Sequence, residues 1–163
     1  MIDKDKKGFL LADETLKIII ALIAIIFLAY FLTQLYFAKV NGDKLQQANA
    51  LLTGSQESLK IIMSSLNESG THIKQVIEPS GWYLFSFSDG DTKPNSCAGD
   101  NCLCICDNAW DINGRFNRQE KECDKNGACL VEKDLGKFDR IEITGEVKNI
   151  NITKIGGKIY FLG

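Results

Sequence analysis

Residues 18–32 read IIIALIAIIFLAYFL, a run without a single charged side chain. After Thr33 and Gln34 the apolar character resumes and continues to Ala38. As an α-helix, residues 18–38 would extend ~31 Å, which is about the thickness of the hydrocarbon core of a bilayer. A helix of this length in a soluble protein normally keeps a polar face, and this run has none. The sequence therefore predicts a transmembrane helix over residues 18–38.

A cleaved secretory signal is the main alternative for such a run near the amino terminus. Signal sequences have a shorter apolar core, and they end in two small residues separated by one position. The residue two positions before Ala38 is Tyr36, which is too large for such a site. We therefore expect an anchor that is retained.

The lysines around the run indicate its orientation. Positive charge in short flanking segments stays on the cytoplasmic side of a membrane helix. Four lysines precede the run and two follow it closely: Lys4, Lys6, Lys7 and Lys17 before it, Lys39 and Lys44 after it. This excess predicts a single-pass protein of the cell membrane, with membrane lipid as its partner, a cytoplasmic amino terminus and the carboxyl-terminal part outside.

Residues 1–17 form a basic leader and a polar lead-in, in which Lys7-Gly8 is followed by FLLADE over residues 9–14. This arrangement resembles the leader of type IV pilins and archaeal pilin-like proteins. In that family a peptidase cuts after the glycine, and an acidic residue, usually Glu, is the fifth of the mature chain. The resemblance implies cleavage between Gly8 and Phe9, with Asp13 as that fifth residue and Glu14 beside it.

The same resemblance implies self-assembly through the amino-terminal helix. An acid at Asp13 or Glu14 would pair with the new amino terminus of a neighbouring subunit, because a buried carboxylate needs a cation close by. The alternative is an ordinary membrane anchor with a polar lead-in. The outer part of the chain, with CLCIC at residues 102–106, is also similar to archaeal membrane proteins, which implies a habitat and no chemistry.

Residues 41–68 predict an amphipathic stalk helix. Apolar or small residues recur there at alternating steps of three and four, which places them on one helix face: Leu45, Ala48, Leu52, Ser55, Leu59, Ile62 and Leu66. Such a face packs either on the outer domain or against other subunits as a coiled coil. Gly54 and Ser55 interrupt it, so we favour packing on the domain.

Residues 72–163 predict a small antiparallel β-domain outside the cytoplasm. After an apolar patch at residues 72–77, short runs rich in β-branched and aromatic residues alternate with turn residues, which is typical of strands. The expected strands are residues 82–87, 102–106, 128–131, 141–144, 147–154 and 158–162, with a hairpin turn at Gly156-Gly157 and mostly loop over 107–127. The fold class is α+β, a long amino-terminal helix followed by this domain.

Six cysteines lie in this domain and none precedes it. They are Cys97, Cys102, Cys104, Cys106, Cys123 and Cys129. Disulfides persist in oxidising compartments, so an even count supports the outside location. On a strand Cys102, Cys104 and Cys106 share one face and pair poorly with one another. Six pairings with the other three remain, and we favour Cys97–Cys102, Cys104–Cys129 and Cys106–Cys123.

Other candidate sites in the sequence are weaker. Three thiols on one face are the basis of a zinc or iron–sulfur alternative, but the spacing fits neither paired CxxC motifs nor ferredoxin runs, so we expect no metal or other cofactor. Asp89-Gly90-Asp91 lacks the later ligands of a calcium loop and predicts a plain turn. Trp110 and Phe116 lie in the polar 107–127 stretch, as an exposed contact site or tucked beneath the loop.

No catalytic residues are recognisable, because the sequence has one histidine and no nucleophile, phosphate-loop or metalloprotease motif. The net charge of −2 excludes the basic footprint of a nucleic-acid-binding protein, and no small-molecule substrate is indicated. We expect a non-enzymatic, membrane-anchored extracytoplasmic protein with a structural or adhesive role, in its sharpest form a pilin-like filament subunit. The alternatives are a monomeric binding module that uses the 107–127 loop, or a metal or redox protein built on the cysteines.

Overall fold

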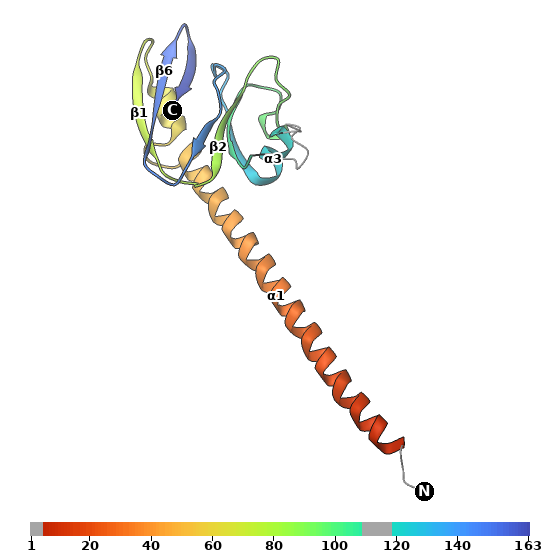
Figure 1. The fold of residues 1–163 in the computed structure, drawn as a ribbon. Helices are drawn as coiled ribbons and strands as arrows, with labels where there is room; N and C mark the ends of the chain where they lie inside the picture. Colours follow the sequence, from red (N-terminus) through yellow and green to blue (C-terminus); the bar gives the residue numbers. More distant parts are fainter. Residues whose placement is uncertain (1–4, 109–118) are drawn as a thin grey trace. The chain divides into compact units, whose positions relative to one another are not determined.

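The computed structural model describes residues 5–108 and 119–163, with side chains described from Glu14 onward (Figure 1). The chain divides into two compact units, residues 1–40 and residues 41–163. The first unit consists of one apolar helix, and the second contains antiparallel sheets and three disulfides. The fold is therefore α+β, as the sequence predicted.

Helix α1 spans Asp5–Thr53 without interruption. It ends before Gly54, whose N–H donates to the carbonyl of Ala50 at 2.8 Å. A Cβ on Gly54 would collide with that carbonyl oxygen, so only glycine fits this position. The stretch 41–68, which we expected to be one stalk helix, is therefore divided between the last turns of α1 and the short helix α2, Leu59–Ser65.

The helical residues of the second unit pack on its sheets. Ala48 and Leu52 near the end of α1 are at most 1% exposed and belong to the main hydrophobic core. Leu59, Ile62 and Met63 of α2 join the same core. The apolar face of the 41–68 stretch thus packs on the domain of its own chain, the arrangement that we favoured over a coiled coil.

Seven strands form two antiparallel sheets in the described part of the second unit. The sequence led us to expect five or six strands in a single sheet. That expectation was wrong because β1, which ends at Val76, does not pair with the next strand in the sequence. It pairs with a strand whose residues lie 72 or more positions further along the chain. The three-stranded sheet has the order β1 (Thr71–Val76), β6 (Lys148–Ile155), β7 (Lys158–Leu162), and the four-stranded sheet the order β4 (Gly127–Val131), β3 (Cys102–Cys106), β2 (Trp82–Phe87), β5 (Ile141–Ile143).

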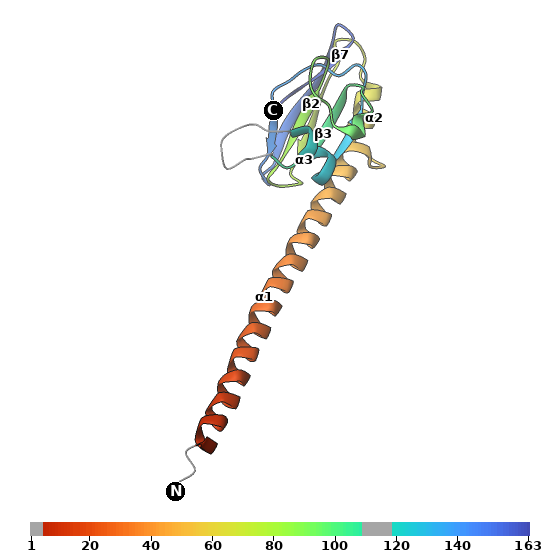
Figure 2. The same cartoon turned by 90° about the vertical axis from the view of Figure 1, so that its right-hand side faces the viewer.

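Two short helices lie in stretches that the sequence presented as loops. One is the 3₁₀-helix η1, Asn95–Cys97, and the other is α3, Gln119–Asn126. Helix α3 is polar and buries one residue, Cys123, so it carries no apolar periodicity from which a helix can be predicted. Figure 2 shows α3 beside β3, and α3 contacts both β3 and β4.

Strand β3, in the interior of the four-stranded sheet, is buried on both faces. Trp82, Leu84, Leu103 and Ile105 alternate along β2 and β3 and point into the main core, where they meet Phe161 and other residues of the three-stranded sheet. The residues between them face the opposite way, toward a second and smaller cluster made of Phe87 and five of the cysteines, with Phe85 and Cys129 packed against it. This second cluster, which we call the cysteine face, is where the candidate site lies.

Candidate functional site

The cysteine face is built on β3, the strand that reads CLCIC. Leu103 and Ile105 point into the main core, so the pleat turns Cys102, Cys104 and Cys106 to the other face. All five residues are 0% exposed. A strand buried on both faces reads as a continuous apolar run, and cysteine is among the most buried residue types, so this sequence suits its place.

Three disulfides connect β3 to the segments around it. They are Cys97–Cys102 to η1, Cys104–Cys129 to β4, and Cys106–Cys123 to α3. Each cysteine of β3 takes a partner from another segment, as strand geometry required, and among the six pairings that geometry left open these are the three that we favoured. A disulfide that closes a loop of some 15 residues stabilises a fold by ~3 kcal/mol in the chain-entropy model, so these bonds support a core of modest size.

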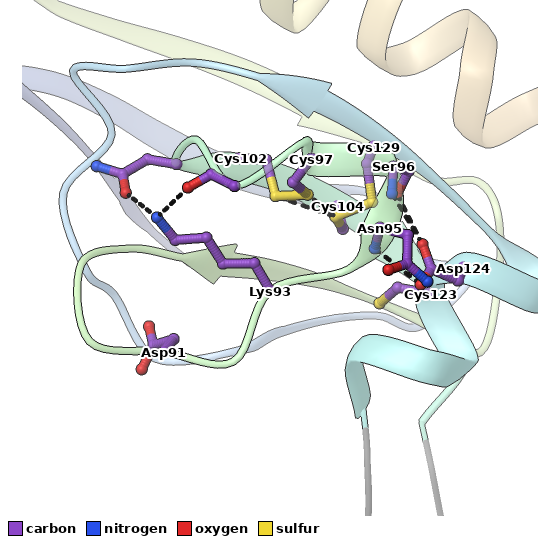
Figure 3. The surroundings of a disulfide bond; sticks show 12 residues. Asp91, Lys93, Asn95, Ser96, Cys97, Cys102, Cys104, Cys123, Asp124 and Cys129 are labelled. Atoms are coloured by element: carbon purple, nitrogen blue, oxygen red, sulfur yellow. Dashed lines mark hydrogen bonds between the residues drawn. A yellow bond between two sulfur atoms is a disulfide. The ribbon is translucent and has the colours of Figure 1, made fainter.

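Hydrogen bonds hold the Asn95–Cys97 helix independently of sulfur (Figure 3). The carboxylate of Asp124 on α3 accepts the N–H groups of Asn95 and Ser96 at 2.8 and 3.0 Å, and the Ser96 hydroxyl at 3.1 Å. Burial alone would raise the pKa of the Asp124 carboxyl, but these donors outweigh it and hold that pKa below its ordinary value. The charged carboxylate is therefore the form that the fold prefers.

Lys93 fixes the loop that follows. Its ammonium group donates to the carbonyl of Gly99 at 3.0 Å and to the side-chain oxygen of Asn101 at 2.9 Å, as Figure 3 shows. Asn101 is itself buried and donates to the carbonyl of Lys133 at 3.2 Å. Polar contacts thus connect the loop between Cys97 and Cys102 to Lys93, in the segment after β2, and to Lys133, in the segment after β4.

A row of aromatic residues in β2 lies on the same face of the four-stranded sheet as the cysteines of β3. Tyr83, Phe85 and Phe87 follow one another at centroid distances of 6.1 and 6.3 Å, and the guanidinium of Arg140 lies 5.3 Å from the Tyr83 ring. Burial, followed by the nearby carboxylate of Glu142, raises the pKa of Tyr83. We expected these aromatics to be core and helix-packing residues; Trp82 is core, whereas Tyr83 and Phe85 are only half-buried.

A pocket of about 530 Å³ opens beside this row. Phe85 and Phe87 form its apolar part, and it is also lined by Asp91, Lys137 and Arg140. Asn108, just after β3, and Gln119 and Glu120, at the start of α3, contribute to the lining as well. The aromatic residues at alternate positions of β2 were the available signal for this pocket, but the charged residues come from segments far along the chain.

The Asp89-Gly90-Asp91 segment is a turn, as the sequence predicted. One oxygen of the Asp91 carboxylate accepts the N–H and hydroxyl of Ser88 at 3.0 and 3.3 Å. The other accepts from Lys137 at 2.6 Å. Burial alone would raise the pKa of Asp91, but these partners lower it, so both oxygens are engaged within the chain.

The remaining candidate residues belong to α1 or lie outside the described residues. Gly8, Phe9 and Asp13 are within α1, but their side chains are outside the described residues, and Glu14 is exposed. Trp110 and Phe116 are outside the described residues altogether. The structure therefore brings together the six cysteines and adds to them the aromatic row, Arg140 and Asp124, which sequence reasoning did not single out.

The large apolar side chains of α1 from Leu16 to Phe37 are between 49% and 68% exposed. Among the described residues, one helix is long and apolar enough to cross a membrane, and it contains this stretch. No known protein family, curated protein or solved structure matches the chain.

Proposed function

We propose that this chain is a non-enzymatic, single-pass membrane protein that displays its disulfide-bonded domain outside the cytoplasm, in a structural or adhesive role. The observation that carries the proposal is the apolar part of α1, from Leu16 to Phe37, in which every large side chain is about half exposed or more. Each such side chain costs ~1.5–3 kcal/mol to leave in water, so a helix of this kind needs an apolar environment.

The other half of the proposal, the location of the domain, is supported by the cysteines. All six are paired, and disulfides are stable in oxidising compartments and rare in the cytosol. The lysine excess before the helix agrees with this orientation, because it favours a cytoplasmic amino terminus. Two independent features of the chain thus favour the same topology.

The sharpest form of the proposal is a pilin-like subunit. The leader motif favours cleavage after Gly8, which would leave Phe9 as the first residue and Asp13 as the fifth. An uninterrupted helix that continues from this leader through the apolar stretch to the domain has the form that a filament core of packed helices needs. Asp13 or Glu14 would then pair with the amino terminus of a neighbouring subunit within that core.

The experiment is expression of the full chain in a host with a prepilin peptidase, followed by membrane fractionation and intact mass measurement with and without reduction. We expect the chain in the membrane fraction, starting at Phe9, with a mass six hydrogen atoms below that of the reduced chain, two for each disulfide. A matched Gly8→Leu variant should remain in the membrane but keep its leader.

Each part of the proposal fails on a distinct result. Recovery from the soluble fraction would refute the membrane anchor. Free cysteines in the cell-derived protein would refute the outside location. A chain that begins at Met1 while an authentic pilin in the same cells is cut would refute the pilin-like form and leave an anchored ectodomain.

The pocket beside the aromatic row favours one second candidate, a monomeric binding module on the same anchor. Its lining combines apolar Phe85 and Phe87 with charged Lys137 and Arg140, and includes three residues of the 107–127 stretch, Asn108, Gln119 and Glu120. Cleaved, filamentous protein would argue for the first candidate. Monomeric protein that loses a surface ligand on Phe85→Ala, but not on a distant Val147→Ala substitution, would argue for the second.

A further inference from the structure

Two of the three disulfides lie against each other on the cysteine face. The Sγ of Cys104 is 3.8 Å from the Sγ of Cys102 and 3.9 Å from the Sγ of Cys97. Together with Cys129, these cysteines place four sulfur atoms within 4.8 Å of one another. We propose that the four cysteines are also a zinc site, in which the thiolates formed by reducing both disulfides bind one Zn²⁺. This inference does not depend on the membrane anchor or on filament assembly, and it concerns the chain with both disulfides reduced, not the oxidised domain outside the cytoplasm.

The distances between the two disulfides match a metal tetrathiolate. With Zn–S bonds of ~2.3 Å, neighbouring sulfurs of a tetrahedral site stand ~3.8 Å apart. The distances from the Sγ of Cys104 to those of Cys102 and Cys97, 3.8 and 3.9 Å, already have about this value. Reduction of the two disulfides would lengthen the two shortest sulfur–sulfur distances, which are the Cys97–Cys102 and Cys104–Cys129 bonds. The four sulfur atoms would then approach a regular tetrahedron.

The direction in which the disulfides face each other also favours a shared ligand. The Sγ of Cys104 is nearly equidistant from the two bonded sulfurs, so it lies beside the Cys97–Cys102 bond and not along its axis. A thiolate that exchanges with a disulfide attacks one sulfur while the other leaves. The side-on arrangement instead resembles two opposite edges of one tetrahedron.

The backbone keeps three of the four ligands in place without any sulfur–sulfur bond. Cys104 and Cys129 are directly opposite partners in the β3–β4 ladder, and Cys102 lies two residues before Cys104 on the same face. The main-chain hydrogen bonds of the ladder and the apolar residues on its other face do not depend on the oxidation state. These positions therefore survive reduction.

The fourth ligand, Cys97, is held by polar contacts that also survive reduction. Asp124 binds the two residues before it through three hydrogen bonds, and Lys93 binds Gly99 in the loop after it. Preorganised ligands reduce the ordering cost of binding a metal.

The chemistry of the set fits a closed structural zinc site. Soft thiolates select zinc over hard cations such as Ca²⁺ and Mg²⁺. Cys97, Cys102 and Cys104 are 0% exposed, and Cys129 is half-buried, which leaves one side for entry of a reductant and a metal. Two equivalents of a dithiol would reduce the two disulfides to four thiols and leave as two disulfides, and binding of Zn²⁺ would release the four thiol protons.

The test uses the full chain in detergent micelles, without oxygen, with the three disulfides reduced by a phosphine because dithiols compete for zinc. Each disulfide consumes one phosphine and one water and yields two thiols and the phosphine oxide. We expect about one Zn²⁺ per chain, and Co²⁺ in its place should give the visible absorption of a tetrahedral tetrathiolate.

Two double variants separate this site from non-specific binding by reduced cysteines. Cys104→Ser with Cys129→Ser removes two ligands, whereas Cys106→Ser with Cys123→Ser removes the same number of thiols outside the set. Retention of the cobalt spectrum in the second variant and its loss in the first would support the site. Failure of the reduced wild-type chain to bind Co²⁺, or equal binding by both variants, would overturn it. Near-UV circular dichroism of each sample before metal addition reports whether the domain remains folded, and refolding on Zn²⁺ by the second variant alone also supports the site.

Discussion

The packing between the two sheets makes a specific prediction about Leu103 at the centre of β3. Its side chain is 0% exposed and belongs to the main core with Trp82 and Phe161. Its cross-strand partners are Ser86 on one side and Leu130 on the other, both fixed by the ladder. Replacing Leu103 with alanine would leave a cavity that these neighbours cannot fill without disturbing both sheets.

The expected cost follows from this burial. Leu→Ala at a fully buried site lowers the free energy of unfolding by ~2–5 kcal/mol, with higher values where the surroundings cannot collapse. We expect ~3 kcal/mol or more for Leu103→Ala, a large share of the stability of a small domain. Leu162→Ala is the matched control, because Leu162 is 59% exposed and the same side chain is removed. Its cost should stay within ~0.5 kcal/mol.

The assay is equilibrium denaturation of the detergent-solubilised chain with its disulfides intact. Tryptophan fluorescence suits it, because Trp82 is 2% exposed within the same core. Equal midpoints for the two variants would refute the two-layer packing. A decrease of less than ~1 kcal/mol in the free energy of unfolding for Leu103→Ala would show that neighbouring side chains move into the cavity, contrary to the rigid packing that we infer from the two ladders.

Three further predictions concern the cysteine face and the helix end. Cys106→Ser with Cys123→Ser removes a bond between residues 17 positions apart and should lower the free energy of unfolding by ~3 kcal/mol in denaturant titrations; an unchanged midpoint would contradict the role of that bond. Asp124→Asn should reduce the dependence of stability on pH. The Asp124 carboxyl, whose pKa is lowered in the fold, stabilises the fold at pH values above its ordinary pKa of 3.8, and this contribution is lost as the pH falls through the lower pKa of the folded state. Wild type should therefore lose more stability than the variant on acidification, and parallel curves of stability against pH would contradict this. Gly54→Ala should lower the thermal midpoint of unfolding, because the added Cβ would collide with the Ala50 carbonyl. Gly42→Ala, inside α1, is the control and should not lower that midpoint, because its Cβ would meet nothing within 4 Å. Equal midpoints for the two variants would contradict the clash at Gly54.

The elements that could be predicted from the sequence are those with a strong local pattern. The apolar run at residues 18–38 permits little besides a helix, and the alternation in β2, β3 and β7 fixes both strand and face. Strand alternation reduced the possible disulfide pairings to six, because it placed three cysteines on one face and required an outside partner for each, but it did not select the observed pairing among the six.

What could not be predicted depends on distant contacts. Nothing local to β1 indicates that it pairs with β6, and nothing in α3 indicates a helix, because Cys123 is its one buried residue. The pocket beside Phe85 needs Lys137 and Arg140, which follow a different strand. Asp124 looked like one more charge in a polar stretch, and its role depends on backbone donors nearly thirty residues earlier.

The Cys106–Cys123 bond has a consequence for proteolysis. It joins the residues on either side of the 107–122 segment, so a single cut anywhere within that segment leaves both pieces covalently attached. A nicked chain would migrate as one species without reductant and as two with it. A surface protease can therefore cut this segment once while the two resulting pieces stay joined as one covalent body.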